Sequence, residues 1–190
     1  MERKKTDRRV LYTKMVLRDS LLELMKEKSI EKITPTELCR KADINRNTFY
    51  SHYYSPMELL KSIEDEIYDK VEHSLDITLQ NDDITGLLTE ICMVIYDNKD
   101  LCRVLFSKYG DKDFLERIVN LAHDKSVEKW KQVAMEGKEE LLEDLYTYLV
   151  NGSMAVIQKW TQTDMKKSPE EIADFIEKVT NYGLQIFKYE

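Results

Sequence analysis

A short polar run in the first third of the chain carries the side chains best suited to contacting nucleic acid. Arg and Asn side chains form paired hydrogen bonds with base edges in the major groove of DNA, while hydroxyl groups commonly bind phosphates. The run is INRNTFYSHY, residues 44–53. The candidate contact residues are the polar members of this run that should face outward and one earlier threonine: Thr36, Arg46, Asn47, Thr48, Tyr50, Ser51 and His52. This set predicts a surface for double-stranded DNA.

Two short helices are expected to position these side chains. Thr34 suits a helix N-cap, Pro35 suits the first helical position, and Glu37 completes a capping box, so a helix is expected over residues 35–42. Asp43 interrupts that helix, and Asn45 can cap a second one. Two helices joined by a short turn, with the second one polar and outward, form the helix-turn-helix layout.

Apolar residues on either side of this layout should complete a small domain. Ile44, Phe49 and Tyr53 are expected to face inward. A preceding helix over residues 13–28 has apolar residues at helical spacing, namely Leu17, Leu21, Leu24 and Met25. Ser55 and Glu58 repeat the cap pattern before a long helix from Pro56 to about residue 78, whose apolar stripe continues past the small domain.

The run ITPTELCRKADINRNTFYSHY, preceded by TKMVLRDSLLELMKEKSIEK, resembles the DNA-binding domain of the tetracycline-repressor-like (TetR/AcrR) transcriptional regulators. The resemblance covers about residues 13–60 and implies that the polar residues named above take the DNA-contacting positions. Two positions depart from the family. Asp43 stands where the family usually has a glycine, so a positive φ is expected there. Pro56 replaces a usual phosphate-binding lysine, which leaves backbone N–H groups for that contact.

Composition predicts an all-α protein. The 190 residues are 42% hydrophobic and include only 5 Gly and 3 Pro, and strand patterns are nearly absent. About nine helices are expected, with a DNA-binding domain over residues 1–55 and a helical ligand-binding and dimerisation domain over residues 56–190. The later helices are expected at residues 84–97, 99–106, 114–135, 138–162 and 169–188.

Charge is divided unevenly along the chain. The net charge is −7, yet residues 1–61 carry 14 Lys and Arg against 9 Asp and Glu. The basic end is therefore the end expected to bind DNA, because an acidic body is repelled by the duplex. The first ten residues contain five basic side chains, Arg3, Lys4, Lys5, Arg8 and Arg9. They fit a flexible arm near phosphates or a minor groove, and fit an ordinary solvated terminus equally well.

Several classes of site are not expected. No apolar run approaches the length that crosses a bilayer, and the charged N-terminus lacks the apolar block of a signal peptide, so a cytoplasmic protein is predicted. Cys39, Cys92 and Cys102 have no Cys-x-x-Cys spacing and fit reduced, structural thiols. His73 and His123 have no partners at metal-binding spacing, so neither a metal nor a cofactor is predicted.

Aromatic residues in the central helices suggest a pocket for an unknown small-molecule effector. For any one of them, simple core packing is the stronger alternative. The candidates are Tyr68, Tyr96, Phe106, Tyr109 and Trp130, with Phe114 nearby.

The last two expected helices are apolar enough to need a partner. The segment YLVNGSMAVIQKWTQ…KKSPEEIADFI is similar to a C-terminal domain found in one branch of the same family, in which this helix pair forms a four-helix bundle with a second subunit. The resemblance implies a homodimer whose interface includes Leu149, Gly152, Ile157, Trp160, Phe175, Val179 and Tyr182. A tolerated helix glycine is the alternative at Gly152.

Three functions are consistent with these features. The first is a ligand-responsive repressor that binds a palindromic operator as a homodimer through its third helix. The second is a helical coactivator that keeps the fold and acts mainly through a protein partner. The third is an enzyme, which has the least support because the paired carboxylates Glu139–Glu140 and Glu170–Glu171 lie near expected helix starts, where acids complement the helix dipole.

Overall fold

The computed structural model describes residues 2–81, 84–131 and 139–185, and the side chains of residues 8–77, 88–121 and 140–185. All regular structure in these residues is helical, which confirms the all-α prediction. The elements are α1 (Glu2–Met25), a 3₁₀ turn (Ile30–Lys32), α2 (Pro35–Ala42), α3 (Arg46–Tyr50), α4 (Pro56–Asn81), α5 (Ile84–Asp97), α6 (Lys99–Leu105), α7 (Lys112–Lys131), α8 (Glu139–Gln162) and α9 (Pro169–Leu184).

The chain forms two compact units. The first contains Met1–Ile67 and Val104–Asp111, and the second contains Tyr68–Arg103 and Lys112–Glu190. Both units include part of α4, because its apolar stripe continues from Leu59 into the second unit. The expected division at residue 55 followed the start of α4, whereas the compact units divide within that helix.

The start of α1 corrects one expectation. The sequence predicted a first helix that begins at residue 13, preceded by a flexible arm or an ordinary solvated terminus, but α1 begins at Glu2. Residues 2–12 contain neither Gly nor Pro and are rich in Arg and Lys, which have good helix propensity. They therefore extend the helix by about three turns.

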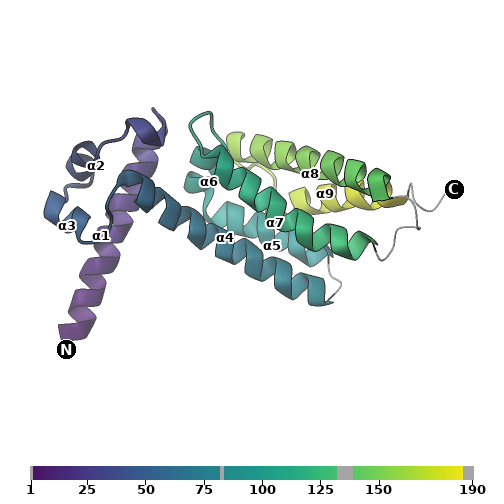
Figure 1. Cartoon of the computed structure of the whole chain (residues 1–190), viewed down its shortest axis with the longest axis horizontal. Helices are drawn as coiled ribbons and strands as arrows, with labels where there is room; N and C mark the ends of the chain where they lie inside the picture. The colour runs from purple at the N-terminus through teal and green to yellow at the C-terminus, as the bar shows by residue number, and fades with distance from the viewer. Residues whose placement is uncertain (1, 82–83, 132–138, 186–190) are drawn as a thin grey trace. The chain divides into compact units, whose positions relative to one another are not determined.

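The core of the first unit is formed by α1, α2, α3 and the beginning of α4 (Figure 1). α1 packs on α2, and α2 packs on α3. The predicted stripe of α1 is buried together with one residue or more from every other element: Leu17, Leu21, Leu24, Met25, Ile30, Leu38, Phe49, Leu59 and Leu60. This burial fixes the faces that α2 and α3 turn to solvent.

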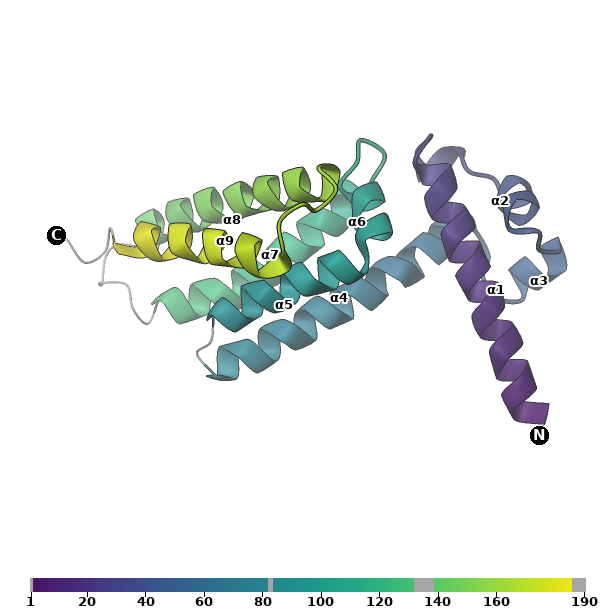
Figure 2. The same cartoon turned by 180° about the vertical axis from the view of Figure 1, so that it is seen from behind.

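In the second unit α8 and α9 lie side by side, α5 packs against α9, and α7 packs against α8 (Figure 1, Figure 2). Leu142 and Tyr146 of α8 form a buried cluster with neighbouring leucines. The Tyr146 hydroxyl donates to the Val119 carbonyl of α7 at 3.3 Å. Gly183 of α9 allows close packing, because a Cβ there would lie 3.3 Å from Leu145.

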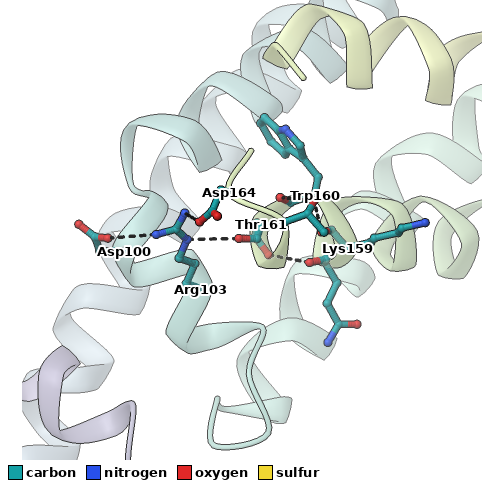
Figure 3. A network of polar contacts seen from close by, with 8 residues as sticks. Asp100, Arg103, Lys159, Trp160, Thr161 and Asp164 are labelled. Carbon is teal, nitrogen blue, oxygen red and sulfur yellow. Dashed lines mark hydrogen bonds and ion pairs between the residues drawn. The ribbon is translucent and has the colours of Figure 1, made fainter. Parts of the chain in front are cut away.

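Polar contacts fix the loop between α8 and α9 (Figure 3). Arg103 of α6 donates through Nε to the Thr161 carbonyl at 3.2 Å and through Nη2 to Asp164 Oδ1 at 2.9 Å. Asp164 and Met165 adopt positive φ values of 58° and 48°. The loop therefore reverses direction in a conformation that L residues rarely adopt, and Arg103 helps to hold it.

A capping box then starts α9. Ser168 Oγ accepts from the Glu171 N–H at 3.2 Å, and the Glu171 carboxylate accepts from the Ser168 N–H at 2.7 Å. Two backbone donors at the helix start are thereby satisfied, as the sequence predicted.

Candidate nucleic-acid interface

The first helix of the helix-turn-helix begins at the predicted cap. Thr34 Oγ1 accepts from the Glu37 N–H at 3.2 Å, with Pro35 at the first helical position. The Glu37 carboxylate accepts from Lys28 Nζ at 2.6 Å, and this hydrogen bond is the main cause that lowers the pKa of Glu37, with a smaller contribution from the Thr34 backbone. The pair links the turn after α1 to the start of α2. Thr36, one residue inside α2, is exposed.

The turn between α2 and α3 is a Schellman motif with an aspartate in the left-handed position. Asp43 has φ 52° and ψ 40°, which confirms the predicted positive φ. The Ile44 N–H donates to the Cys39 carbonyl at 3.0 Å, and the Asp43 N–H donates to the Arg40 carbonyl at 3.5 Å. These two bonds, with apolar residues at both ends, define the motif. Its geometry sets the direction in which α3 leaves α2.

α3 is short and is oriented by one side chain. Asn45 Oδ1 accepts from the Asn47 N–H at 2.8 Å, as expected for an N-cap. Phe49 is fully buried, and its ring contacts Tyr50 and Tyr53 with centroid separations of 5.4 and 6.2 Å. Burial of Phe49 directs the polar side of the helix to solvent.

The predicted contact residues divide into an exposed and a half-buried group. Thr36, Arg46, Asn47, Tyr50 and Ser51 are exposed, while Thr48 and His52 are half-buried. Ser51 uses its hydroxyl within the helix, donating to the Thr48 carbonyl at 2.7 Å. The structure thus brings six of the seven residues together on α3 and the turn after it, with Thr36 on α2.

Arg46 and Tyr50 form a pair on the exposed side of α3. The guanidinium carbon lies 5.9 Å from the Tyr50 ring centroid. A hydrogen bond and the charge interaction with Tyr50 raise the pKa of Arg46 above its usual value. Arginine is charged at neutral pH in any case, so the pairing matters for position rather than for charge. It places a cation and a phenol hydroxyl on one turn of helix.

A groove of about 450 Å³ separates α3 from the N-terminal half of α1. Thr48 and His52 line one side, and Arg8, Arg9 and Tyr12 line the other. Tyr12 is 61% exposed and was missed by the sequence reasoning. The sequence spacing could have indicated Tyr12, since Arg8 and Tyr12 are four residues apart and share a helix face. That inference requires a helix that already includes residues 8–12.

The start of α4 is capped next to this face. Ser55 Oγ accepts from the Glu58 N–H at 3.1 Å, and the Glu58 carboxylate accepts from the Tyr54 N–H. Pro56 is buried at the first helical position. Tyr54 is 85% exposed beside it and is a second aromatic that the sequence reasoning did not select.

The proposed effector-pocket aromatics are dispersed. Tyr68 lies under Arg117, whose guanidinium carbon is 4.9 Å from the ring centroid, and Tyr96 is half-exposed and stacks on Trp160. Phe106 and Phe114 are buried. Tyr109 belongs with Phe106 to the first compact unit, whereas Tyr68 and Tyr96 belong to the second. Trp130 lies outside the residues whose side chains are described.

The predicted dimer residues also separate into two groups. Leu149, Ile157 and Trp160 are buried inside the subunit. Trp160 donates from Nε1 to the Lys167 carbonyl at 2.9 Å. The other four predicted residues, Gly152, Phe175, Val179 and Tyr182, are exposed on α8 and α9, where Tyr148 joins them at 73% exposure. Phe175, Val179, Tyr148 and Gly152 line a groove of about 460 Å³ between the two helices.

The three cysteines are free thiols set inside the protein, as the sequence predicted. Cys39, Cys92 and Cys102 are free and buried. Burial raises the pKa of Cys92 to about 12, with a smaller contribution from the charge of Glu170. Among the described residues, no group of three or more His, Cys, Asp and Glu side chains could hold a metal ion. No helix in the described part of the chain is long and apolar enough to span a membrane.

A three-helix unit with this turn and this exposed α3 defines the class of helix-turn-helix DNA-binding proteins. A TetR family model described as a transcriptional regulator C-terminal region matches residues 82–182, more than half of the chain. The chain belongs to the TetR family of transcriptional regulators.

Individual relatives agree with this assignment. The chain is 39% identical over 61 residues to an uncharacterised helix-turn-helix regulator, YxbF of Bacillus subtilis (strain 168). That match spans 32% of this chain and only 16% of the relative's length. Two solved structures share the fold. A TetR regulator from Streptococcus agalactiae 2603V has a TM-score of 0.62 at 21% identity, covering 93% of this chain and 98% of that one. The dihydroxyacetone kinase operon activator DhaS has a TM-score of 0.58 at 18% identity, covering 92% and 97%.

Proposed function

We propose that the chain acts in the cytoplasm as a homodimeric, ligand-responsive repressor that binds a palindromic operator through α3. The observation that carries the proposal is the exposed face of α3: Arg46, Asn47 and Tyr50 face solvent around a single buried side chain, Phe49. Arg and Asn suit base edges, and the Tyr50 hydroxyl suits a phosphate. Arg8 and Arg9, across the groove from Thr48, add positive charge beside that face.

Homodimerisation is supported by the exposed apolar side chains of α8 and α9. Tyr148 and Tyr182 are each more than two-thirds exposed, and Phe175 and Val179 are about half exposed. A two-fold dimer through this face presents two copies of α3 to half-sites about one DNA turn, roughly 34 Å, apart.

Ligand response is the remaining part of the proposal. An effector that binds the second unit and prefers one direction of α4 changes the separation of the two α3 helices, because α4 belongs to both units. Operator affinity then falls by the ratio of effector affinities for the two states.

An activator is the second candidate, and one observation favours it. The DhaS protein, which shares the fold over nearly its full length, is described as an operon activator. A coactivator that acts mainly through a protein partner would bind its operator only when that partner is present, whereas the proposed repressor binds alone.

The test compares two substitutions on α3. Arg46→Ala should make the free energy of operator binding less favourable by about 1–3 kcal/mol, because a base contact is lost. The difference in affinity between operator and unrelated DNA should therefore become smaller. Tyr50→Phe keeps the ring on Phe49 but removes the hydroxyl that suits a phosphate and that also bonds Arg46. It should weaken binding to operator and unrelated duplexes by about 1 kcal/mol for each hydrogen bond lost. Fluorescence anisotropy with labelled duplexes measures both effects.

Matched controls are available in the second unit. Lys112→Ala removes an exposed cation on α7, and Tyr96→Phe removes a phenol hydroxyl on α5 while keeping the ring on Trp160. Neither should change the affinity of a dimer for DNA. The proposal that α3 contacts DNA is wrong if the Arg46→Ala and Tyr50→Phe variants bind operator and unrelated DNA with the same affinities as the wild-type protein.

A further inference from the structure

We propose that two reciprocal ion pairs, Asp144 with Lys159 of the partner subunit, set the register of an antiparallel α8 pair that crosses at Gly152. The inference rests on the homodimer proposed above and adds the point at which the two α8 helices cross and the charges that select it. It is carried by the exposed stripe of α8 and by the charges at its two ends.

The stripe has one residue per turn. Asp144, Tyr148, Gly152, Ala155 and Lys159 recur at spacings of three and four and are all exposed, so they share one face of the helix. The helix begins with four acidic residues among its first six, at positions 139, 140, 143 and 144, whereas its C-terminal end carries Lys159. The following loop carries Lys166, Lys167 and Asp164, and Asp164 is paired with Arg103. One face therefore runs from negative to positive.

Such a face is complementary to a second copy of itself in the antiparallel direction. With a rise of 1.5 Å per residue, Asp144 lies about 12 Å and Lys159 about 10 Å from Gly152, on opposite sides. A two-fold crossing near Gly152 consequently places each aspartate opposite the partner's lysine, once at each end. A parallel pair would place like charges together, which is unfavourable.

Both charges are available for such a contact. Among the side chains that the structure describes, neither Asp144 nor Lys159 forms an ion pair within the subunit. In Figure 3 the Lys159 side chain extends away from the Arg103 network. The fourteen residues of α8 between Asp144 and Lys159 contain no charged side chain, so no other charge in that interval competes for this register.

Gly152 fits the crossing point. Gly in a helix interior is unfavourable relative to Ala, so its presence needs a reason. A Cβ at Gly152 would meet nothing within 4 Å inside the subunit, so packing within the subunit does not require glycine there. Close approach of a second backbone does require it. At this register Tyr148 of the partner subunit lies opposite the small residue Ala155, beside a groove of about 410 Å³ lined by Val156, Trp160 and Phe175.

Charge reversal tests the pairing in the full-length chain. Asp144→Lys and Lys159→Glu should each weaken the homodimer by roughly tenfold, because two attractions become two repulsions. When the two variants are co-expressed with different tags, both pairs in the mixed dimer are attractive. Native mass spectrometry should then find the heterodimer well above the share expected from random pairing, and sedimentation velocity on dilution gives the homodimer constants.

Matched reversals on α7 provide the control. Glu116→Lys and Lys112→Glu carry the same charge changes on exposed positions of another helix and should pair at random with unchanged affinity. Random pairing of the α8 variants with unweakened homodimers would overturn the register while leaving the homodimer intact. A wild-type chain that stays monomeric would refute the homodimer itself, and with it the proposed ion pairs. The exposed stripe of α8 would then be a candidate contact surface for a different protein.

Discussion

Phe49 is the side chain that turns the polar face of α3 to solvent. Its burial, with Tyr53 beneath it, leaves Arg46, Asn47 and Tyr50 on the outside of the helix. The sequence was sufficient to predict this division, because Phe49 is the one residue of this five-residue helix without a polar group and so marks the face to bury.

The burial of Trp160 within one subunit could not be predicted from the sequence. Its place in an apolar stripe suggested a subunit interface, yet it is only 3% exposed within one subunit. Its ring stacks on Tyr96 of α5, and its Nε1 donates to a carbonyl in the loop after α8. The first partner depends on how α5 packs, and the second on the fold of the loop, which contains two residues with positive φ that no local pattern predicted.

Cys92 gives a prediction that depends on pH. Its folded pKa is about 12, above the ordinary thiol value of about 8.5 in an unfolded chain. The folded state therefore retains a proton that the unfolded state loses, so this contribution to stability is complete below about pH 8.5 and is lost as the pH rises toward about 12. Urea unfolding should show a smaller alkaline loss of stability in Cys92→Ala than in the wild type.

The same burial predicts the reactivity of this thiol. At neutral pH a disulfide-exchanging reagent should not modify Cys92 in the folded protein and should modify it in urea, because the thiolate is the reactive form. Rapid modification of Cys92 in the native state would show that the thiol is not enclosed as described.

At the scale of elements, helix starts were predicted best. The side chains of Thr34, Asn45, Ser55 and Ser168 each accept a hydrogen bond from the backbone N–H two or three residues ahead. Such a cap involves only residues that are close in sequence, so the local sequence is enough to predict it. The start of α1 was missed because residues 2–12 lack apolar periodicity, although their helix propensity is good.

The α2–α3 turn yields a prediction about Asp43. Its left-handed conformation disfavours a Cβ, so Asp43→Ala should lower the free energy of unfolding by about 1 kcal/mol, whereas Asp43→Gly should change it by no more than about 0.5 kcal/mol. At Asp19, an exposed position inside α1, the order should reverse, with Gly worse than Ala by about 1 kcal/mol. Urea unfolding of the four variants measures both differences.

At the scale of the molecule, the change from basic to acidic sequence lies close to the boundary between the two compact units in α4. The first 61 residues have an excess of 5 positive charges, and the rest of the chain is strongly acidic. In the proposed function, long-range repulsion between the acidic part and DNA should confine DNA binding to the basic first part of the chain. The effector-pocket aromatics could not be assigned in this way, because aromatic residues fill cores as readily as they line pockets.

The measurement that tests the account most directly is selection of duplexes from a random pool by the purified protein, followed by a footprint on the enriched sequence. The account predicts an inverted repeat with half-sites about one helical turn apart, protected as two patches, and an affinity that falls steeply with added salt. No enriched sequence, together with no binding to duplex DNA even in dilute buffer, would contradict it.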